Sequence, residues 1–156
     1  MLRILGLVFL SIIAMVAIAV GFSIRQDRHA REYVVTAIPA IYKDWNFGEI
    51  KSRAAAQLRD DPQFNSAGPP MFEMLRNTFG PLQKADEPQG SAGYGWGDGA
   101  PARGTYGDYV AHATFAKAEA ELELFVVKEN GEWRIAGFHV NSPALVQTTS
   151  AEEGQR

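Results

Sequence analysis

Three histidines, His29, His112 and His139, have the widest chemical range in this chain, because imidazole can act as a base, an acid or a metal ligand. They are far apart in the sequence, and no His-x-x-x-His or His-x-Glu pair occurs, although metal sites need several converging ligands. The pattern therefore predicts no metal site. His112 and His139 would meet only if their strands are neighbours.

Asp44 would act as a general base only if the fold buried it. Such a role needs a buried carboxylate with a raised pKa near a polar group such as Tyr109 or His112. Asp44 lies next to Trp45 at the predicted end of a helix, which favours an exposed position. The chain has no cysteine, so thiol catalysis and cysteine-based zinc sites are excluded. We therefore expect no catalytic residue, no enzyme activity and no cofactor.

Glycines alternate with Tyr94, Trp96 and Asp98 through residues 93–99. A nucleotide-binding glycine loop follows a strand and opens a helix, whereas polar residues precede this stretch and Pro101 follows it. We interpret it as a surface loop. Tyr94 and Trp96 would contact a partner there, because exposed aromatic residues are enriched at interfaces.

Glu119, Glu121 and Glu123 alternate along one predicted strand and so share one face of it. An acidic stripe of this kind binds a cation or a basic partner, or is simply the solvated face of an antiparallel strand.

The length and composition fit one folded domain that follows an apolar N-terminal segment. The chain has 156 residues, with 15 basic and 18 acidic side chains. A pI near 5.6 argues against nucleic-acid binding, which needs a basic stripe. Apolar residues make up 46% of the chain, enough for a folded core.

Residues 1–25 read as a transmembrane anchor or a signal segment. No charged residue occurs from Ile4 to Ile24, and at about 1.5 Å per residue this stretch matches the roughly 30 Å hydrocarbon core of a bilayer. A signal peptide would end at Ala17-Ile18-Ala19. We favour the anchor because apolar residues continue past Ala19.

The location follows from this segment. We expect a single-pass protein of the inner (plasma) membrane, with its domain on the extracytoplasmic, periplasmic side. The flanking basic residues, Arg3 before the segment and Arg25, Arg28 and Arg31 after it, would by the positive-inside rule favour the opposite orientation. Charge alone leaves both orientations open.

Three helices are predicted ahead of the strands. An apolar stripe with helical spacing predicts the first, with a kink or break at Pro39; its members are Ala30, Tyr33, Val34, Ala37, Ile38, Ile41, Tyr42 and Trp45. Asn46 and Glu49 form a capping box that opens a second helix, which continues through Leu58. The third is expected to begin at Pro69-Pro70 and to end at Gly80.

Strands follow. Residues 82–105 are rich in glycine and are expected to form a loop, or two loops around a short irregular strand. Alternating apolar residues predict strands around Tyr109–Phe115 and Leu122–Val127, and Asn130-Gly131 predicts a hairpin to a last strand. The fold class is α+β, with N-terminal helices packed on a curved antiparallel sheet over residues 26–145 and a disordered tail at 146–156.

The hairpin Asn130–Phe138 (NGEWRIAGF), the helix end Arg76–Leu82 (RNTFGPL) and the strand Tyr109–Phe115 together resemble the small exported or membrane-anchored bacterial domains of unknown function with a cystatin-like or NTF2-like fold. The resemblance covers roughly residues 28–142. It implies a cone-shaped sheet wrapped on a long helix and an extracytoplasmic domain. Its motifs are structural, and they imply no activity.

Three functions follow for such a domain. The first is a non-catalytic, membrane-anchored domain that binds an unknown protein partner or self-associates at the membrane surface. The second is binding of a small apolar ligand inside the cone, in a pocket between Trp45, Tyr109, His112 and Trp133. The third, hydrolase or isomerase chemistry, would need Asp44 to be buried beside Tyr109 or His112.

Overall fold

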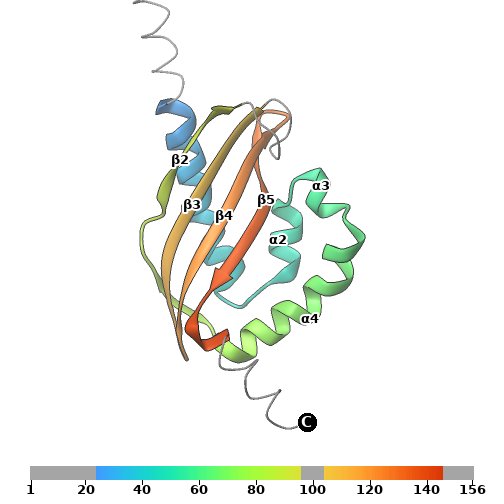
Figure 1. Ribbon diagram of the computed structural model, residues 1–156, viewed down its shortest axis with the longest axis vertical. Helices are drawn as coiled ribbons and strands as arrows, with labels where there is room; N and C mark the ends of the chain where they lie inside the picture. Colours follow the sequence, from blue (N-terminus) through green and yellow to red (C-terminus); the bar gives the residue numbers. More distant parts are fainter. Residues whose placement is uncertain (1–23, 96–103, 146–156) are drawn as a thin grey trace, which may run out of the picture.

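The computed structural model describes residues 24–95 and 104–145. In this part of the chain, helices α1–α4 precede a five-stranded antiparallel sheet, so the α+β class is confirmed (Figure 1). The predicted membrane segment lies outside the described residues except for its last two positions, and the predicted tail lies wholly outside them. Within the described ranges, no helix has both the length and the apolar character needed to cross a bilayer.

The described part of α1 covers residues 24–42 and confirms the predicted apolar stripe. Val34, Ala37 and Ile41 are fully buried, and every other stripe member is buried or half-buried. The expected break at Pro39 does not occur. Proline removes the bond to the carbonyl four residues earlier, and that carbonyl belongs to Val35 on the exposed face, where water can bind it.

A tight turn ends α1 and places Trp45 in the core. The Asn46 amide donates to the Ile41 carbonyl at 2.8 Å, the six-to-one bond of a Schellman motif. Trp45 occupies the left-handed position of this motif, with φ 53°, where glycine is usual. Its indole Nε1 donates to the Gly80 carbonyl at 2.7 Å, and its ring stacks on Phe79 and Phe115. These contacts offset the conformational cost of a side chain at that position.

The second predicted helix is two helices. Asn46 caps α2 (Phe47–Arg53) as predicted, since its side chain accepts from the Glu49 amide at 3.2 Å. The helix does not continue, because the Ala55 amide donates to the Ile135 carbonyl at 2.7 Å and draws the chain onto the sheet. A short α3 (Ala56–Arg59) follows.

The helix α4 (Pro62–Phe79) begins seven residues earlier than Pro69, where its start was predicted. Asp61 is its N-cap, and its carboxylate accepts from the amides of Gln63 and Phe64. The exposed Pro69-Pro70 pair lies inside the helix. The stronger cap at Asp61 therefore sets the boundary, while Gly80 ends the helix as predicted.

The sheet has the order β1-β3-β4-β5, and β2 also pairs with β3. Its strands are β1 (Leu82–Ala85), β2 (Gln89–Gly95), β3 (Gly104–Phe115), β4 (Glu119–Glu129) and β5 (Glu132–Asn141). The prediction of a loop over 82–105, with at most one short irregular strand, was wrong, because two strands form there, and β1 and β2 pair with successive parts of β3 along the same edge. Glycine-rich β2 carries little side-chain signal, and β3 supplies its register.

The hairpin between β4 and β5 is confirmed at Asn130-Gly131, whose φ angles of 51° and 87° fit a turn of left-handed residues. Val126 pairs with Ile135 and Phe125 with Gly137, so the extra residue is Ala136. This bulge shifts the side-chain alternation, so that residues on both sides of it reach the core.

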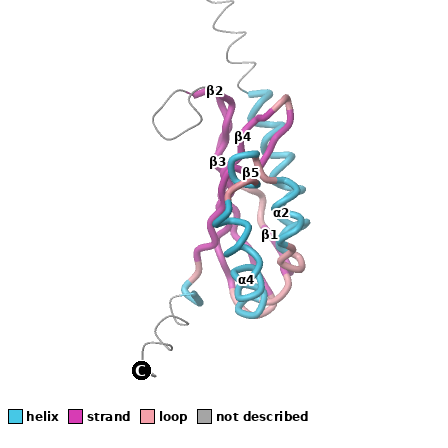
Figure 2. The backbone as a smooth tube through the Cα atoms, turned by 90° about the vertical axis from the view of Figure 1, so that its right-hand side faces the viewer, coloured by secondary structure: helices cyan, strands magenta, loops and turns pink. Residues whose placement is uncertain are grey.

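The core lies between α1 and the inner face of the sheet, with α1, α2 and α4 on that side (Figures 1 and 2). Leu122, Leu124 and Val126 of β4 alternate with outward-facing residues and are fully buried. At the end near Trp45, aromatic rings pack edge to face and in stacks; they are Tyr42, Phe72, Phe79 and Phe115. This end of the interior is thus filled by aromatic side chains.

Replacing Trp45 tests how much of this packing depends on one side chain. We expect Trp45→Ala to lower the free energy of unfolding by about 3–5 kcal/mol, since it removes a buried aromatic side chain. Trp45→Phe keeps most of the ring contacts but leaves the Gly80 carbonyl without its donor, at a cost of about 1–3 kcal/mol. Unfolding of the full chain in mild detergent, followed by near-UV circular dichroism, measures both. Met74→Ala, at a half-exposed site, is the control, and equal losses in Met74→Ala and Trp45→Ala would contradict the prediction.

Tyr42 offers the opposite test. Its side chain is fully buried, its hydroxyl has no hydrogen-bond partner among the described residues, and burial raises its pKa. Because an unsatisfied buried hydroxyl is destabilising, we expect Tyr42→Phe to raise the stability by about 1 kcal/mol. The same unfolding measurement applies. A loss of stability would show that the hydroxyl is satisfied in solution.

Candidate functional site

The four residues of the predicted ligand pocket are not brought together. Trp45 contacts Phe115 at the end of β3 that lies beside the start of β4. Trp133 instead pairs with Lys128, near the end of β4. At about 3.3 Å per residue, β4 is roughly 35 Å long. His112 alternates with the buried residues of β3 and lies exposed on the outer face of the sheet.

Asp44 is not near Tyr109 either. It is exposed just beyond the C-terminal end of α1. Tyr109 donates to the Asp27 carboxylate near the other end of that helix, roughly 25 Å away along its axis. The described residues therefore do not form the buried acid cluster that acid–base chemistry in the cone would require.

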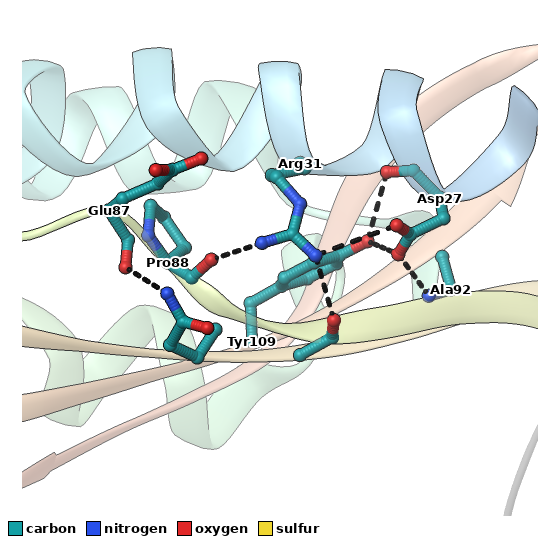
Figure 3. A network of polar contacts seen from close by, with 8 residues as sticks. Asp27, Arg31, Glu87, Pro88, Ala92 and Tyr109 are labelled. Carbon is teal, nitrogen blue, oxygen red and sulfur yellow. Dashed lines mark hydrogen bonds and ion pairs between the residues drawn. The ribbon is translucent and has the colours of Figure 1, made fainter. Parts of the chain in front are cut away.

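Instead, Tyr109 belongs to a polar network that sequence reasoning missed (Figure 3). Its hydroxyl donates to Asp27 Oδ1 at 2.8 Å, and the Ala92 amide donates to the same oxygen at 2.9 Å. Arg31, one turn after Asp27 on α1, lies 3.5 Å from Asp27 Oδ2. Its guanidinium also lies 5.6 Å from the centroid of the Tyr109 ring.

The network supplies hydrogen-bond partners to backbone groups at the edge of β2 that does not face β3. Arg31 donates to the carbonyls of Pro88 and Gly90, at 2.7 Å and 3.0 Å, and Asp27 accepts from the amide of Ala92. Alternate residues of a strand direct their backbone groups to the same edge, so two side chains of α1 take the place of a neighbouring strand. Gly90 is required there, because its φ is +151° and a Cβ would lie 2.0 Å from the Asp108 carbonyl oxygen.

The electrostatics of the network suit a structural clamp. Partial burial alone would raise the pKa of Asp27, but the hydrogen bonds from Tyr109 and Ala92 and the charge of Arg31 outweigh it and lower that pKa. Burial and the bond to Asp27 raise the pKa of Tyr109. The carboxylate is thus a weaker base, and the phenol a weaker acid, than usual. The spacing of Asp27 and Arg31 directly after the apolar segment was the only sequence signal for this pair.

The outer face of the sheet is a second feature with functional potential. Tyr106, Val110 and Phe125 lie on it half-buried, and the rings of Tyr106 and Phe125 are 6.0 Å apart. Farther along the same face, cross-strand partners are His112 with Glu121 and Glu123 with His139. We refer to the residues Tyr106, Val110, His112, Glu119, Glu121, Glu123, Phe125 and His139 as the outer patch.

The acidic end of the outer patch is hollowed. A pocket of about 760 Å³ is lined there by His112, Glu119, Glu121, Asn141 and Ser142. In the described part of the chain, no group of three histidine or acidic side chains is arranged to hold a metal ion. His112 lies on β3 and His139 on β5, with β4 between them, so the two histidines are not on neighbouring strands and do not meet as cross-strand partners.

Tyr94 and Trp96 were predicted to contact a partner. Tyr94 lies near the end of β2 and is 56% exposed. Trp96 lies outside the described residues.

In comparisons with known proteins, the chain matches no family model, and no curated protein or solved structure is significantly similar to it. The fold and the site define the chain as an α+β domain whose helices cover one face of a five-stranded antiparallel sheet.

The clamp predicts a specific pH dependence. Because the pKa of Asp27 is lower in the folded chain than its unfolded value near 3.9, the carboxylate adds stability above about pH 4, and this is lost as the pH falls through the folded pKa. Asp27→Asn should remove this part of the pH dependence and cost about 1–3 kcal/mol at pH 7. Thermal unfolding between pH 2 and pH 7 measures both effects.

Asp60→Asn is the matched control, since that carboxylate is exposed and its partner is the adjacent Arg59. If Asp27→Asn and Asp60→Asn gave the same profile as the unsubstituted chain, Asp27 would not act as a clamp.

Proposed function

We propose that this chain is a non-catalytic, membrane-anchored domain that binds a protein partner, or a second copy of itself, through the outer patch. Residues 1–25 would hold it in the inner (plasma) membrane as a single-pass protein, with the domain on the extracytoplasmic side. Its architecture would be that of the cystatin-like or NTF2-like domains, which also place a long helix against a curved sheet.

The observation that carries this proposal is the composition of the outer patch. The face of an antiparallel sheet that meets only water usually carries polar side chains, while the opposite face carries the apolar ones. Here Tyr106 and Val110 are the diagonal neighbours of Phe125, on either side of its direct partner Asp108, and no described helix covers them (Figure 2). Aromatic and apolar groups bordered by charges are typical of surfaces that bind proteins.

The acidic end of the patch indicates the chemistry of the partner. Glu119, Glu121 and Glu123 project from β4 on the same face as the aromatic pair. A partner that places apolar groups on Tyr106 and Phe125 and basic groups on the glutamates would complement both halves.

The alternative, binding of an apolar ligand inside the cone, has less support. A ligand pocket needs a cavity of some hundreds of cubic ångströms lined by apolar groups. The space around Trp45 is instead occupied by stacked rings, and that around Tyr109 by the Asp27 clamp.

Site-specific photocrosslinking in intact membranes tests the proposal. A photoreactive phenylalanine analogue in place of Val110 should crosslink to a discrete partner, or to a second copy. The same analogue in place of exposed Glu73 on α4 should not, because that position lies on another surface. Glu121→Lys combined with Glu123→Lys should abolish the adduct at position 110.

Denaturing gels and mass spectrometry identify the adduct. Equal crosslinking at positions 110 and 73, or an adduct that survives the double charge reversal, would contradict a specific role for the outer patch.

A further inference from the structure

A pocket of about 560 Å³ lies between α1, the end of α2 and the β4–β5 hairpin. His29 and Tyr33 of α1 form one wall, and Arg53 closes the end of α2. Lys128, Trp133 and Arg134 come from the two strands of the hairpin. Residues from three separate parts of the chain thus converge on one hollow.

The lining is strongly basic although the chain as a whole carries a net charge of −3. Arg53, Lys128 and Arg134 line the pocket, and Glu132 is its one acidic lining residue. Glu132 binds Arg134, while Lys128 donates to the neutral Gln26 amide oxygen at 2.9 Å. Arg53 pairs with Glu49 at 3.1 Å through Nε, which uses one of the five N–H donors of its guanidinium.

Arg53, Arg134 and Tyr33 line the same pocket, and the Tyr33 hydroxyl donates to the Arg53 carbonyl at 3.4 Å. Arg134 donates to the Ser52 carbonyl at 3.2 Å, which fixes its guanidinium beside the end of α2. Burial raises the pKa of Tyr33 and outweighs the charges of the two arginines, which act to lower it.

Trp133 supplies an independent sign of a missing acceptor. Trp133 is only 8% exposed, and its indole Nε1–H has no hydrogen-bond partner among the described residues. Indole nitrogen is only a donor, so an anion oxygen in the pocket would satisfy it. The Lys128 ammonium lies 5.9 Å from the centroid of the same ring.

We propose that this pocket binds a phosphate-bearing anion, and that the anion is the headgroup of an acidic membrane lipid. Arginine pairs match the geometry of phosphate oxygens, and Lys128 and the indole N–H add further donors.

The position of the pocket selects the lipid over free phosphate. The β4–β5 hairpin that lines the pocket lies at the same end of the domain as the first described turns of α1 (Figure 1). His29 follows the predicted apolar segment, which ends at Ile24, by five residues, or roughly 7.5 Å of helix. The headgroup layer is about 5–8 Å thick on each side of the bilayer. The phosphate site needs no anchor, but its assignment to a lipid rests on the proposed membrane attachment.

The indole resonance of Trp133 reports on occupancy. The full chain is labelled with ¹⁵N and held in uncharged maltoside micelles. It is titrated separately with sodium phosphate, dioctanoyl phosphatidylglycerol and dioctanoyl phosphatidylcholine. The variant Trp133→Phe identifies which indole resonance belongs to Trp133. We expect a saturable shift with phosphatidylglycerol at concentrations at least about tenfold lower than with phosphate, and a weaker response to the zwitterionic lipid. Arg134→Gln and Lys128→Gln should each weaken binding about tenfold or more.

Arg76→Gln is the matched control, since Arg76 is exposed on α4 away from the pocket, and it should bind as the unsubstituted chain does. Thermal unfolding of each variant confirms that it is folded. No shift in any arm, or binding that Arg134→Gln and Arg76→Gln weaken equally, would overturn the site. Phosphate binding without a preference for phosphatidylglycerol would overturn the lipid assignment. Alkaline extraction of the full chain from membranes tests the anchor separately, so a failure of attachment and a failure of the pocket are distinguishable.

Discussion

The packing of α1 along the inner face of the sheet is the contact on which the other features depend. Near its start, Asp27 and Arg31 bind the edge of β2; in its middle, Val34 and Ile38 fill the core; at its end, Trp45 joins the turn to the end of α4. Each fully buried apolar side chain of the stripe contributes about 1.5–3 kcal/mol. The core interface is thus built by the helix that directly follows the predicted membrane segment in the sequence.

This packing covers parts of both edges of the sheet and leaves its outer face without a described helix on it. On one side of the sheet, the backbone groups of β2 are bound by Asp27 and Arg31. On the other, β5 is met by the chain between α2 and α3, where Ala55 donates to Ile135. Covered edges discourage the addition of a further strand. The uncovered outer patch can bind a partner only through its side chains, which makes recognition depend on the aromatic pair and the glutamates.

Elements with a local chemical signal were predictable from the sequence. The Asn46 cap, the Asn130-Gly131 turn and the alternation of β3 and β4 depend on nearby residues. The errors fell where distant contacts decide: the pairing of Ala55 with Ile135 divides a helix, and β3 supplies the register that glycine-rich β2 lacks. The candidate site was harder, because Asp27 and Tyr109, or Tyr33 and Arg134, are brought together only by the fold. An i, i+4 charge pair on a helix is common on any surface, so Asp27 and Arg31 carried no distinctive signal.

The distribution of charge makes the two proposed surfaces compatible in one molecule. The basic pocket lies beside the β4–β5 hairpin, whereas Glu119 and Glu121 lie at the opposite end of β4. Glu129 lies ten positions after Glu119 in β4, which corresponds to roughly 33 Å of strand. Electrostatic interactions are screened within about 8 Å at physiological ionic strength. A phosphate-bearing surface at the hairpin would therefore attract the basic pocket without repelling Glu119 and Glu121, and the outer patch would stay accessible to the proposed basic partner. In this arrangement the sign of the charge at the contacting end matters more than the net charge of the molecule, so an acidic chain would be compatible with the proposed acidic lipid.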